Sequence, residues 1–226
     1  MLVKEWMSTN VITIDAQDSM YDATGLMLAH PIRRLPVTHR NTLVGIVTDR
    51  DLKRSSASDA TSLEIHELLY ILAKIKVSEI MTKDPITVPP DFTVEETAEL
   101  LLKHKISGVP VVDESGRLQG IITQTDLFRV LISLTGVGVR GIQFAMMIKD
   151  QPGTIKDVED IIRVYGGRMV SILTSYDRVP EGYRRLFIRM HSIERGKLED
   201  LEQDLAQKAR MLYIVDQREN RRRIYQ

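Results

Sequence analysis

The sequence predicts a mixed α+β protein with α/β character, in which a duplicated β-α-β-β-α unit is followed by a β-α-β-β-α-β domain. Two observations predict this fold class. Residues 3–54 recur as residues 77–129, and each copy alternates between strand-like and helix-like apolar spacing. After a glycine-rich stretch the pattern changes to the order of a ferredoxin-like split βαβ fold. We therefore expect two paired repeats and one further domain.

The two copies share three segments in the same order. The first segment reads WMS in one copy and IMT in the other, the second reads RLPV and GVPV, and the third reads GIVTDRDL and GIITQTDL. A doubled unit is expected to pair its halves around a pseudo-twofold axis. The cleft between the halves would then carry two related sites.

Composition narrows the functional classes. The chain has 226 residues, 43% of them hydrophobic, and 31 Lys and Arg against 31 Asp and Glu. A net charge of zero argues against nucleic acid or an anionic membrane as the main partner. There are no cysteines, which excludes disulfides and thiolate chemistry. Without an apolar run of roughly 20 residues or signal-peptide features, we expect a soluble, cytoplasmic protein.

Both repeats contain the same series of predicted strands and helices. A short strand, residues 12–14 or 86–88, precedes a helix that begins with the Ser/Thr-x-x-acid spacing of a capping box, Ser19 with Asp22 and Thr93 with Glu96. In the helices, Met20, Ala23, Met27 and Leu28 in the first copy and Val94, Ala98, Leu101 and Leu102 in the second recur at helical spacing. Strands at 35–38, 43–47, 109–113 and 118–122 follow, and a further helix begins near residue 49 and near residue 125.

The remaining segments complete five predicted parts. A polar break at 55–60 precedes a connecting helix, whose apolar members are Leu63, Leu68, Leu69, Leu72 and Ile75. The predicted boundaries are residues 1–60 for repeat 1, 61–135 for the connecting helix and repeat 2, 136–141 for a glycine-rich linker, 142–217 for the third domain, and 218–226 for a charged tail. The tail is expected to be loose and solvated.

The third domain begins with alternating residues at 142–149, typical of a half-buried strand. A turn at 150–154 leads into a helix that carries Ile155, Val158, Ile161, Ile162 and Tyr165 and is ended by Gly166-Gly167. Strands at 168–175 and 184–191 come next. A helix with Leu198, Leu201 and Leu205 and a strand at 211–215 complete the order.

The strongest site candidates are Thr48 with Asp51 and their counterparts Thr123 with Asp126. A carboxylate just past a strand end can accept both hydroxyls of a ribose, while a threonine hydroxyl and free helix amides can meet a phosphate. Thr-x-x-Asp is also a capping box, which needs no ligand. The duplication within a wider Gly-x-x-Thr-x-x-Asp frame favours binding, because glycine at 45 and 120 lets a bulky ligand approach the backbone.

Both copies resemble cystathionine-β-synthase (CBS) domains in their Met-Thr-like start, their Leu/Val-Pro-Val strand and their Gly-x-x-Thr-x-x-Asp ending. Two copies look like a Bateman module, which implies an adenine nucleotide as a regulatory ligand. By resemblance the aspartates bind ribose, the threonines lie near ribose or phosphate, and the backbone at 12–13 and 86–87 meets adenine. The candidate nucleotide-binding residues are Ile12, Thr13, Arg34, Pro36, Thr48, Asp51, Ile86, Thr87, Pro110, Thr123 and Asp126.

The two predicted sites are not equivalent. Arg33, Arg34 and Arg50 in the first copy correspond to Ser107, Gly108 and Thr125 in the second. Arginine neutralises phosphate charge, which serine and glycine cannot do. We expect the first site to tolerate more phosphates, with structural surface arginines as the alternative.

The C-terminal half resembles an ACT domain, and the CBS-CBS-ACT order resembles the acetoin-utilisation AcuB family. In ACT domains the turn after the first strand often contacts an amino-acid effector. The resemblance therefore implies Asp150, Gly153 and Thr154 as effector-binding residues, beside helix amides that attract a carboxylate. The alternative is that Pro152-Gly153 only makes the turn and Thr154 caps the helix.

The expected function is that of a ligand-sensing regulatory protein without catalysis of its own. Neither a nucleophile elbow nor a Walker loop is present, and His30 and His104 lack further metal ligands at a helpful spacing. No catalytic residue, metal or required cofactor is therefore predicted. The expected partners are a small-molecule ligand and further copies of the chain, as a homodimer or tetramer. A structural scaffold with vestigial ligand sites is the alternative.

Overall fold

The computed structural model describes residues 1–57 and 65–225, and the chain forms two compact units. The first unit is Met1–Phe128 and the second is Arg129–Gln226. Their division falls inside helix α6 (Gln124–Thr135), ahead of the glycine-rich stretch 136–141 that was predicted as the linker.

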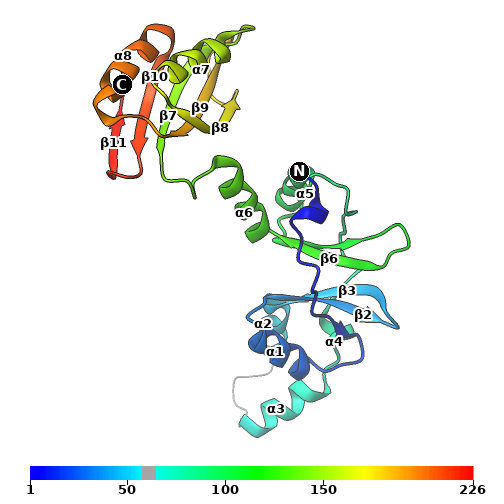
Figure 1. Cartoon of the computed structure of the whole chain (residues 1–226). Coiled ribbons are helices and arrows are strands. Elements are labelled where there is room, and N and C mark those ends of the chain that lie inside the picture. Colours follow the sequence, from blue (N-terminus) through cyan, green and yellow to red (C-terminus); the bar gives the residue numbers. More distant parts are fainter. Residues whose placement is uncertain (58–64, 226) are drawn as a thin grey trace. The chain divides into compact units, whose positions relative to one another are not determined.

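The first repeat is built on the hairpin of β2 (Arg34–His39) and β3 (Thr42–Thr48), shown in Figure 1. β1 (Ile14–Asp15) pairs with β2 in parallel, and α1 (Met20–Ala29) and α2 (Asp49–Ala57) complete the repeat. Ser19 caps α1, because its hydroxyl accepts from the Asp22 amide and the Asp22 carboxylate accepts from the Ser19 amide, as predicted. α3 (Ile65–Lys74) follows, and its Leu72, together with Ile75, packs on the core of this repeat. The predicted Leu63, and the side chains of Leu68 and Leu69, lie outside the described part.

The second repeat has the same plan. α5 (Val94–His104) is capped by Thr93 and Glu96, and the hairpin of β5 (Gly108–Val112) and β6 (Leu118–Thr123) leads into α6. The prediction of a strand at residues 86–88 is wrong. In its place, the structure has an isolated parallel bridge between Val88 and Val111. Prolines at 85, 89 and 90 explain this difference, since proline has no amide hydrogen with which to extend a ladder.

The leading segments of the two repeats are exchanged. The amide of Val3, in the short helix η1 (Val3–Glu5), donates to the carbonyl of Phe92 in the second repeat at 2.8 Å. In return, the amide of Val77 in α4 (Val77–Ile80) donates to Asp18 in the first repeat at 2.9 Å, and β4 (Thr82–Lys83) pairs with β3. Val3 and Val77 are both fully buried. Each predicted repeat therefore contributes its own start to the fold of the other.

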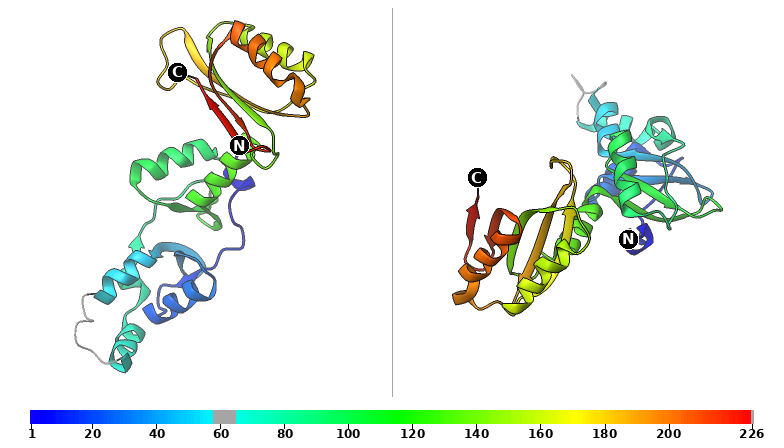
Figure 2. Two further views of the ribbon diagram at one scale, coloured as in Figure 1. Left: turned by 90° about the vertical axis from the view of Figure 1, so that its left-hand side faces the viewer. Right: turned by 90° about the horizontal axis from the view of Figure 1, so that it is seen from above.

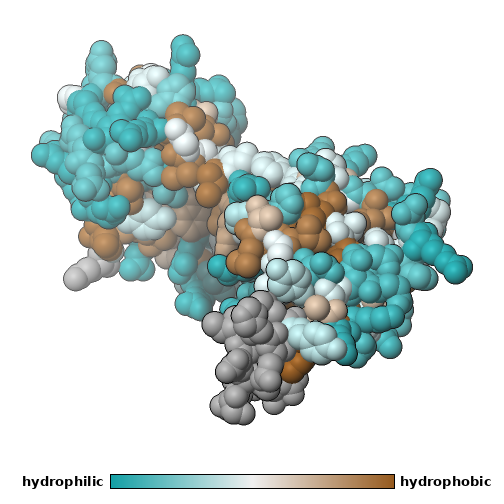
Figure 3. Space-filling model, turned by 90° about the horizontal axis from the view of Figure 1, so that it is seen from below, coloured by the Kyte–Doolittle hydropathy of each residue, from teal (hydrophilic) through white to brown (hydrophobic). Residues whose placement is uncertain are grey.

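The apolar faces of α1 and α5 differ from the prediction at equivalent positions. Met20, Ala23, Val94 and Leu101 are buried as expected, but Leu28 is 77% exposed and Leu102 is 74% exposed. Both leucines lie near the C-terminal ends of their helices, and each directly follows a buried residue, Met27 or Leu101. Figure 3 shows one largely hydrophilic face of the molecule, interrupted by apolar areas. Among the described helices, none is both long and apolar enough to span a bilayer.

The second unit is a five-stranded sheet in the order β11-β10-β7-β9-β8. Its strands are β7 (Ile142–Lys149), β8 (Arg168–Ser175), β9 (Tyr183–His191), β10 (Arg210–Asp216) and β11 (Arg221–Ile224). Helices α7 (Thr154–Val164) and α8 (Leu198–Lys208) lie on one face of this sheet (Figure 2), and a short helix η2 (Arg195–Lys197) precedes α8. The buried core includes Phe144, Ile162, Ile188 and Leu201. The order from β7 to β10 is the predicted β-α-β-β-α-β order.

The prediction of a loose tail at residues 218–226 is wrong for most of this segment. β11 pairs antiparallel with β10, from Tyr213 opposite Ile224 to Asp216 opposite Arg221. Tyr225 packs against the core of this unit, and both its hydroxyl and the Arg223 guanidinium bond to Glu202 of α8. The charged side chains stay in solvent while the backbone completes the sheet, so net charge alone was a poor guide to order.

Candidate functional site

The Thr-x-x-Asp pairs lie where β3 and β6 pass into α2 and α6. Asp51 Oδ2 accepts hydrogen bonds from the Thr48 amide at 2.9 Å and from the Thr48 hydroxyl at 2.6 Å. Asp126 Oδ2 accepts from the amide and hydroxyl of Thr123 at 2.9 and 2.7 Å. Asp51 is half-buried and Asp126 is 4% exposed. Both pairs therefore cap their helices, as the simpler interpretation predicted.

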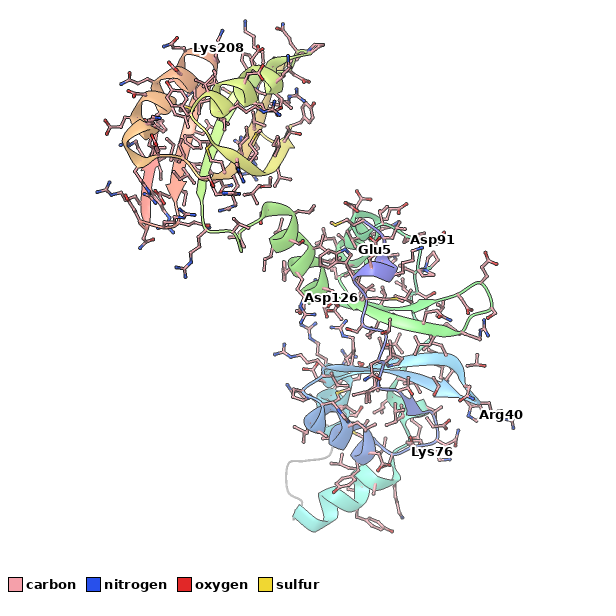
Figure 4. All side chains as sticks on the ribbon, viewed as in Figure 1. Glu5, Arg40, Lys76, Asp91, Asp126 and Lys208 are labelled. Carbon is pink, nitrogen blue, oxygen red and sulfur yellow. The ribbon has the colours of Figure 1, made fainter. Side chains whose placement is uncertain are left out.

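The capping geometry uses the same oxygen in both repeats. Oδ2 of each aspartate receives two hydrogen bonds, which is about the number of lone-pair positions that a carboxylate oxygen offers. The cap also holds each carboxylate in one orientation at the end of its strand. Figure 4 labels Asp126 at the beginning of α6.

Arg34 connects the first repeat to the second, where it meets Ser107 and its own counterpart, Gly108. Its Nη2 donates to the Ser107 hydroxyl at 2.6 Å, and a Cβ on Gly108 would lie only 2.3 Å from Arg34 Nη1. Arg34 pairs with Thr48 across the β2–β3 hairpin, and Gly108 pairs with Thr123 across the β5–β6 hairpin. The guanidinium therefore lies beside strand residues of both predicted sites.

The electrostatics of Arg34 reflect this position. Burial lowers the pKa of the guanidinium, and the carboxylates of Asp49 and Asp126 act in the opposite direction. Asp49 belongs to the first repeat and Asp126 to the second, so the Arg34 guanidinium interacts electrostatically with carboxylates of both repeats. An arginine in this position stays charged and offers several donors to an anion. By contrast, Arg33 and Arg50 are exposed.

The other predicted nucleotide-binding residues lie nearby in the two repeats. Pro36 and Pro110 are buried within β2 and β5. Ile12 and Thr13 directly precede β1, and Ile86 and Thr87 directly precede the Val88 bridge; all four are half-buried. Ile12 packs against the core of the first repeat.

The expectation for the two strand glycines is corrected by the structure. A Cβ on Gly45 would lie 2.4 Å from Met81 Sδ, and a Cβ on Gly120 would lie 2.5 Å from Met7 Sδ. Both methionines come from the exchanged leading segments. The space above each glycine is therefore taken by a side chain of this protein rather than left for a ligand. Sequence alignment paired Met7 with Met81 but could not show that each packs on the opposite repeat.

The predicted effector residues Asp150, Gly153 and Thr154 lie in the turn 150–154 of the second unit, where they interact with neighbouring protein groups. Gly153 is the N-cap of α7, with φ of 89°, so the alternative that Thr154 caps this helix is wrong. The Thr154 hydroxyl donates to the Gln151 carbonyl at 3.0 Å. Asp150 Oδ1 lies 3.4 Å from both Arg184 Nε and the Tyr176 hydroxyl. Arg184, which sequence reasoning did not single out, places a cation at this turn.

Comparison with known proteins identifies the repeats. The sequence model of the CBS domain family matches residues 3–58 and 77–133. Inosine-5'-monophosphate dehydrogenase of Korarchaeum cryptofilum is 40% identical over 119 residues, which cover 53% of this chain but only 22% of that enzyme. The residues matched by the family model span both repeats and end ahead of β7.

Two solved structures resemble the same region. The CBS domain pair of protein MJ0100, in complex with 5'-methylthioadenosine and S-adenosyl-L-methionine, is 33% identical with a TM-score of 0.50, and covers 58% of this chain and 99% of that one. A structure described as an acetoin utilization protein (AcuB) from Vibrio cholerae is 29% identical with a TM-score of 0.51, and covers 61% and 95%.

Proposed function

Because this chain belongs to the CBS domain family, we propose that its paired repeats form a regulatory sensor that binds an adenine nucleotide or a related adenosine compound between them. The observation that carries the proposal is the duplicated Thr-x-x-Asp ending, with Arg34 bonded across the repeats to Ser107. The CBS pair of MJ0100, which is complexed with two adenosine compounds, supports the ligand class.

The capping hydrogen bonds are compatible with ribose binding. Since Oδ2 of each aspartate already accepts two hydrogen bonds, a ribose hydroxyl that donated to Oδ2 would displace the threonine hydroxyl. The cap also removes rotational freedom from the carboxylate before a ligand arrives, which lowers the entropy cost of binding. Capping and binding are then two roles of one side chain.

The two sites would differ in the charge that they accept. Arg34 lies opposite Thr48 in the β2–β3 hairpin and bonds to Ser107 of the second repeat, and its counterpart is Gly108. We assign phosphate recognition to Arg34 and expect ligands with more phosphates on the side of the first repeat. Thr13 and Thr87, with Ile12 and Ile86, are assigned to adenine.

In the second unit, we propose an ACT-type regulatory domain with an amino-acid effector at the turn 150–154. The cation of Arg184 supports recognition of a carboxylate, and it is already engaged with Asp150. Helix α6 runs from Gln124 in the first unit to Thr135 in the second, and Asp126 caps its beginning. The Thr135 carbonyl accepts hydrogen bonds from Arg189 and Ser171 within the second unit. This helix is the proposed route of coupling, which requires the ligand to favour one conformation over another.

The assembly proposed is a homodimer or tetramer. Leu28 and Leu102 occupy equivalent positions on α1 and α5 and are largely exposed, and exposed apolar side chains on helices are suited to an interface between copies. Burying these leucines in a dimer would remove their apolar surface from water.

Thermal denaturation with AMP, ADP, ATP, NAD and S-adenosylmethionine tests the sensor function. A ligand that binds only the folded chain raises the melting temperature with concentration. The double variant Asp51→Ala, Asp126→Ala should lose this rise. The matched control is Asp22→Ala, Glu96→Ala, which removes the carboxylates of two equivalent caps outside the site and should keep it. A rise lost equally in both variants would assign the aspartates to folding alone. Absence of any rise at millimolar ligand would support the scaffold alternative.

A further inference from the structure

A hollow of about 360 Å³ lies in the second unit, where β10 begins beside the end of β7. The hollow is a shallow depression open to solvent, and its volume lies at the lower end of the range of small-ligand pockets. Its lining includes Met147, Lys149, Tyr183, Lys208, Ala209 and Arg210. None of these residues belongs to the turn 150–154 or to the CBS repeats.

Three elements bring three cations to this hollow. Met147 of β7 lies opposite Arg210 of β10, and Lys149 lies opposite Tyr183 of β9, so the strand register places these residues next to one another. Lys208 is the last residue of α8, labelled in Figure 4. A cation at a helix C-terminus suits the helix dipole, which is a sufficient reason for Lys208. It does not account for Lys149 or Arg210, which lie on strands.

The charges of this cluster are not balanced locally. Lys149, Lys208 and Arg210 are exposed, and none has an ion pair with a residue in the described ranges. By contrast, Lys156 and Lys197 of the same unit are paired with Asp160 and Glu194. The second unit carries 18 Lys and Arg against 13 Asp and Glu, although the whole chain is neutral. An excess of positive charge in a hollow attracts small anions.

The lining also has an apolar part. Met147 is half-buried and Ala209 is 8% exposed, which leaves a short apolar surface beside the three cations. Tyr183 also lines the hollow, and its hydroxyl can act as a neutral donor. A phosphate monoester matches this combination, because a dianionic head with three acceptor oxygens can meet several cations while its organic part contacts the methionine.

We propose that this hollow is a second ligand site, which binds a small phosphate monoester through Lys149, Lys208 and Arg210. The site goes beyond the proposed adenine site and does not depend on it, since no residue is shared. It would place a phosphorylated metabolite beside the strand end from which the turn 150–154 begins.

Titration of the full-length, isotope-labelled chain with phenyl phosphate tests the proposal, followed by amide chemical shifts and by calorimetry. We expect shifts at residues 147–149 and 208–210, and an affinity about tenfold lower in Lys149→Gln, Lys208→Gln. The matched control is Lys156→Gln, Lys197→Gln, which removes the same charges elsewhere in this unit and should change the affinity by less than about twofold. Benzoate, with one carboxylate on the same ring, should bind more weakly than phenyl phosphate.

Two results would overturn the proposal. One is equal loss of affinity in both double variants, which would show a general effect of net charge. The other is a set of shifts confined to the repeats. The variant Asp51→Ala, Asp126→Ala separates the two sites, since it should leave phenyl phosphate binding at the hollow unchanged even if adenosine compounds no longer bind.

Discussion

Arg34 Nη2 and the Ser107 hydroxyl lie 2.6 Å apart and join the two repeats. Ser107 precedes Gly108, which is the repeat counterpart of Arg34 itself. A residue that contacts the region of its own counterpart must lie near the axis that relates the repeats. The arginine is accommodated because position 108 lacks a side chain, so the duplicated sequence has diverged where the two copies meet.

The first prediction concerns phosphate recognition by Arg34. Arg34→Ala should weaken ATP binding about tenfold, because a charge-assisted contact to phosphate is lost, and should change adenosine binding by less than about twofold. Calorimetry with the two ligands measures the difference. Arg33→Ala removes the same charge from an exposed neighbour and is the control. Equal losses for ATP and adenosine would mean that Arg34 acts by holding the repeats together.

The second prediction concerns the glycines beneath the exchanged methionines. Gly45→Ala and Gly120→Ala should each lower the free energy of unfolding by about 1–3 kcal/mol, because a Cβ at either position would also lie 2.9–3.0 Å from a backbone oxygen. Urea denaturation measures this loss.

Gly25→Ala is the matched control for the glycine variants. A Cβ at Gly25 meets nothing within 4 Å, and the residue lies inside α1, so alanine should stabilise the chain by about 0.5–1 kcal/mol. Tolerance of alanine at 45 and 120 would show that Met7 and Met81 do not pack there.

The third prediction is a pH dependence at the β5–β6 turn. The Ser115 hydroxyl, with the main chain and guanidinium of Arg117, lowers the pKa of Asp113 to about 2 from its ordinary 3.8. A carboxylate with a depressed pKa contributes stability above its unfolded-state pKa, and this stability is lost as the pH falls through the folded-state value.

Asp113→Asn should therefore be less stable than the wild type at neutral pH, and the difference should shrink as the pH falls below about 4 and vanish only below about pH 2. Thermal denaturation of both proteins across this range measures it. A difference that is independent of pH would assign the effect to turn geometry and not to the charge of Asp113.

The fourth prediction concerns the C-terminal strand. Tyr225→Ala should cost about 1–2 kcal/mol, because it removes a ring packed on the core together with the hydroxyl bond to Glu202. Arg222→Ala, in the adjoining strand β11, removes an exposed side chain that bonds to nearby Asn220 and should be nearly neutral. If both variants were neutral in chemical denaturation, the tail would be loose, as the sequence suggested.

The sequence predicted most elements because their signals are local. The capping boxes at Ser19 and Thr93 and the alternation in β7 lie within a few residues, and the structure has each of them. The exchange of leading segments could not be predicted in this way. Val3 and Val77 bond through backbone groups to the opposite repeats, and backbone pairing leaves no pattern in the side chains.

In the candidate site too, local features could be predicted from the sequence, whereas contacts between distant segments could not. The repeat pointed to Thr48, Asp51, Thr123 and Asp126 and could also be explained by capping, and the structure has the capping hydrogen bonds. The interaction of Arg34 with Ser107 depends on how the repeats meet, and Arg184 reaches Asp150 through the strand register. Such contacts between distant segments require the fold.

A crystal structure grown with a saturating adenosine compound tests the central claim most directly. The account predicts electron density for the ligand between the repeats, with ribose hydroxyls within hydrogen-bond distance of Asp51 or Asp126 and phosphate, where present, near Arg34. If side chains filled that space while both carboxylates bonded only to Thr48 and Thr123, the claim that this chain senses adenosine compounds would be contradicted.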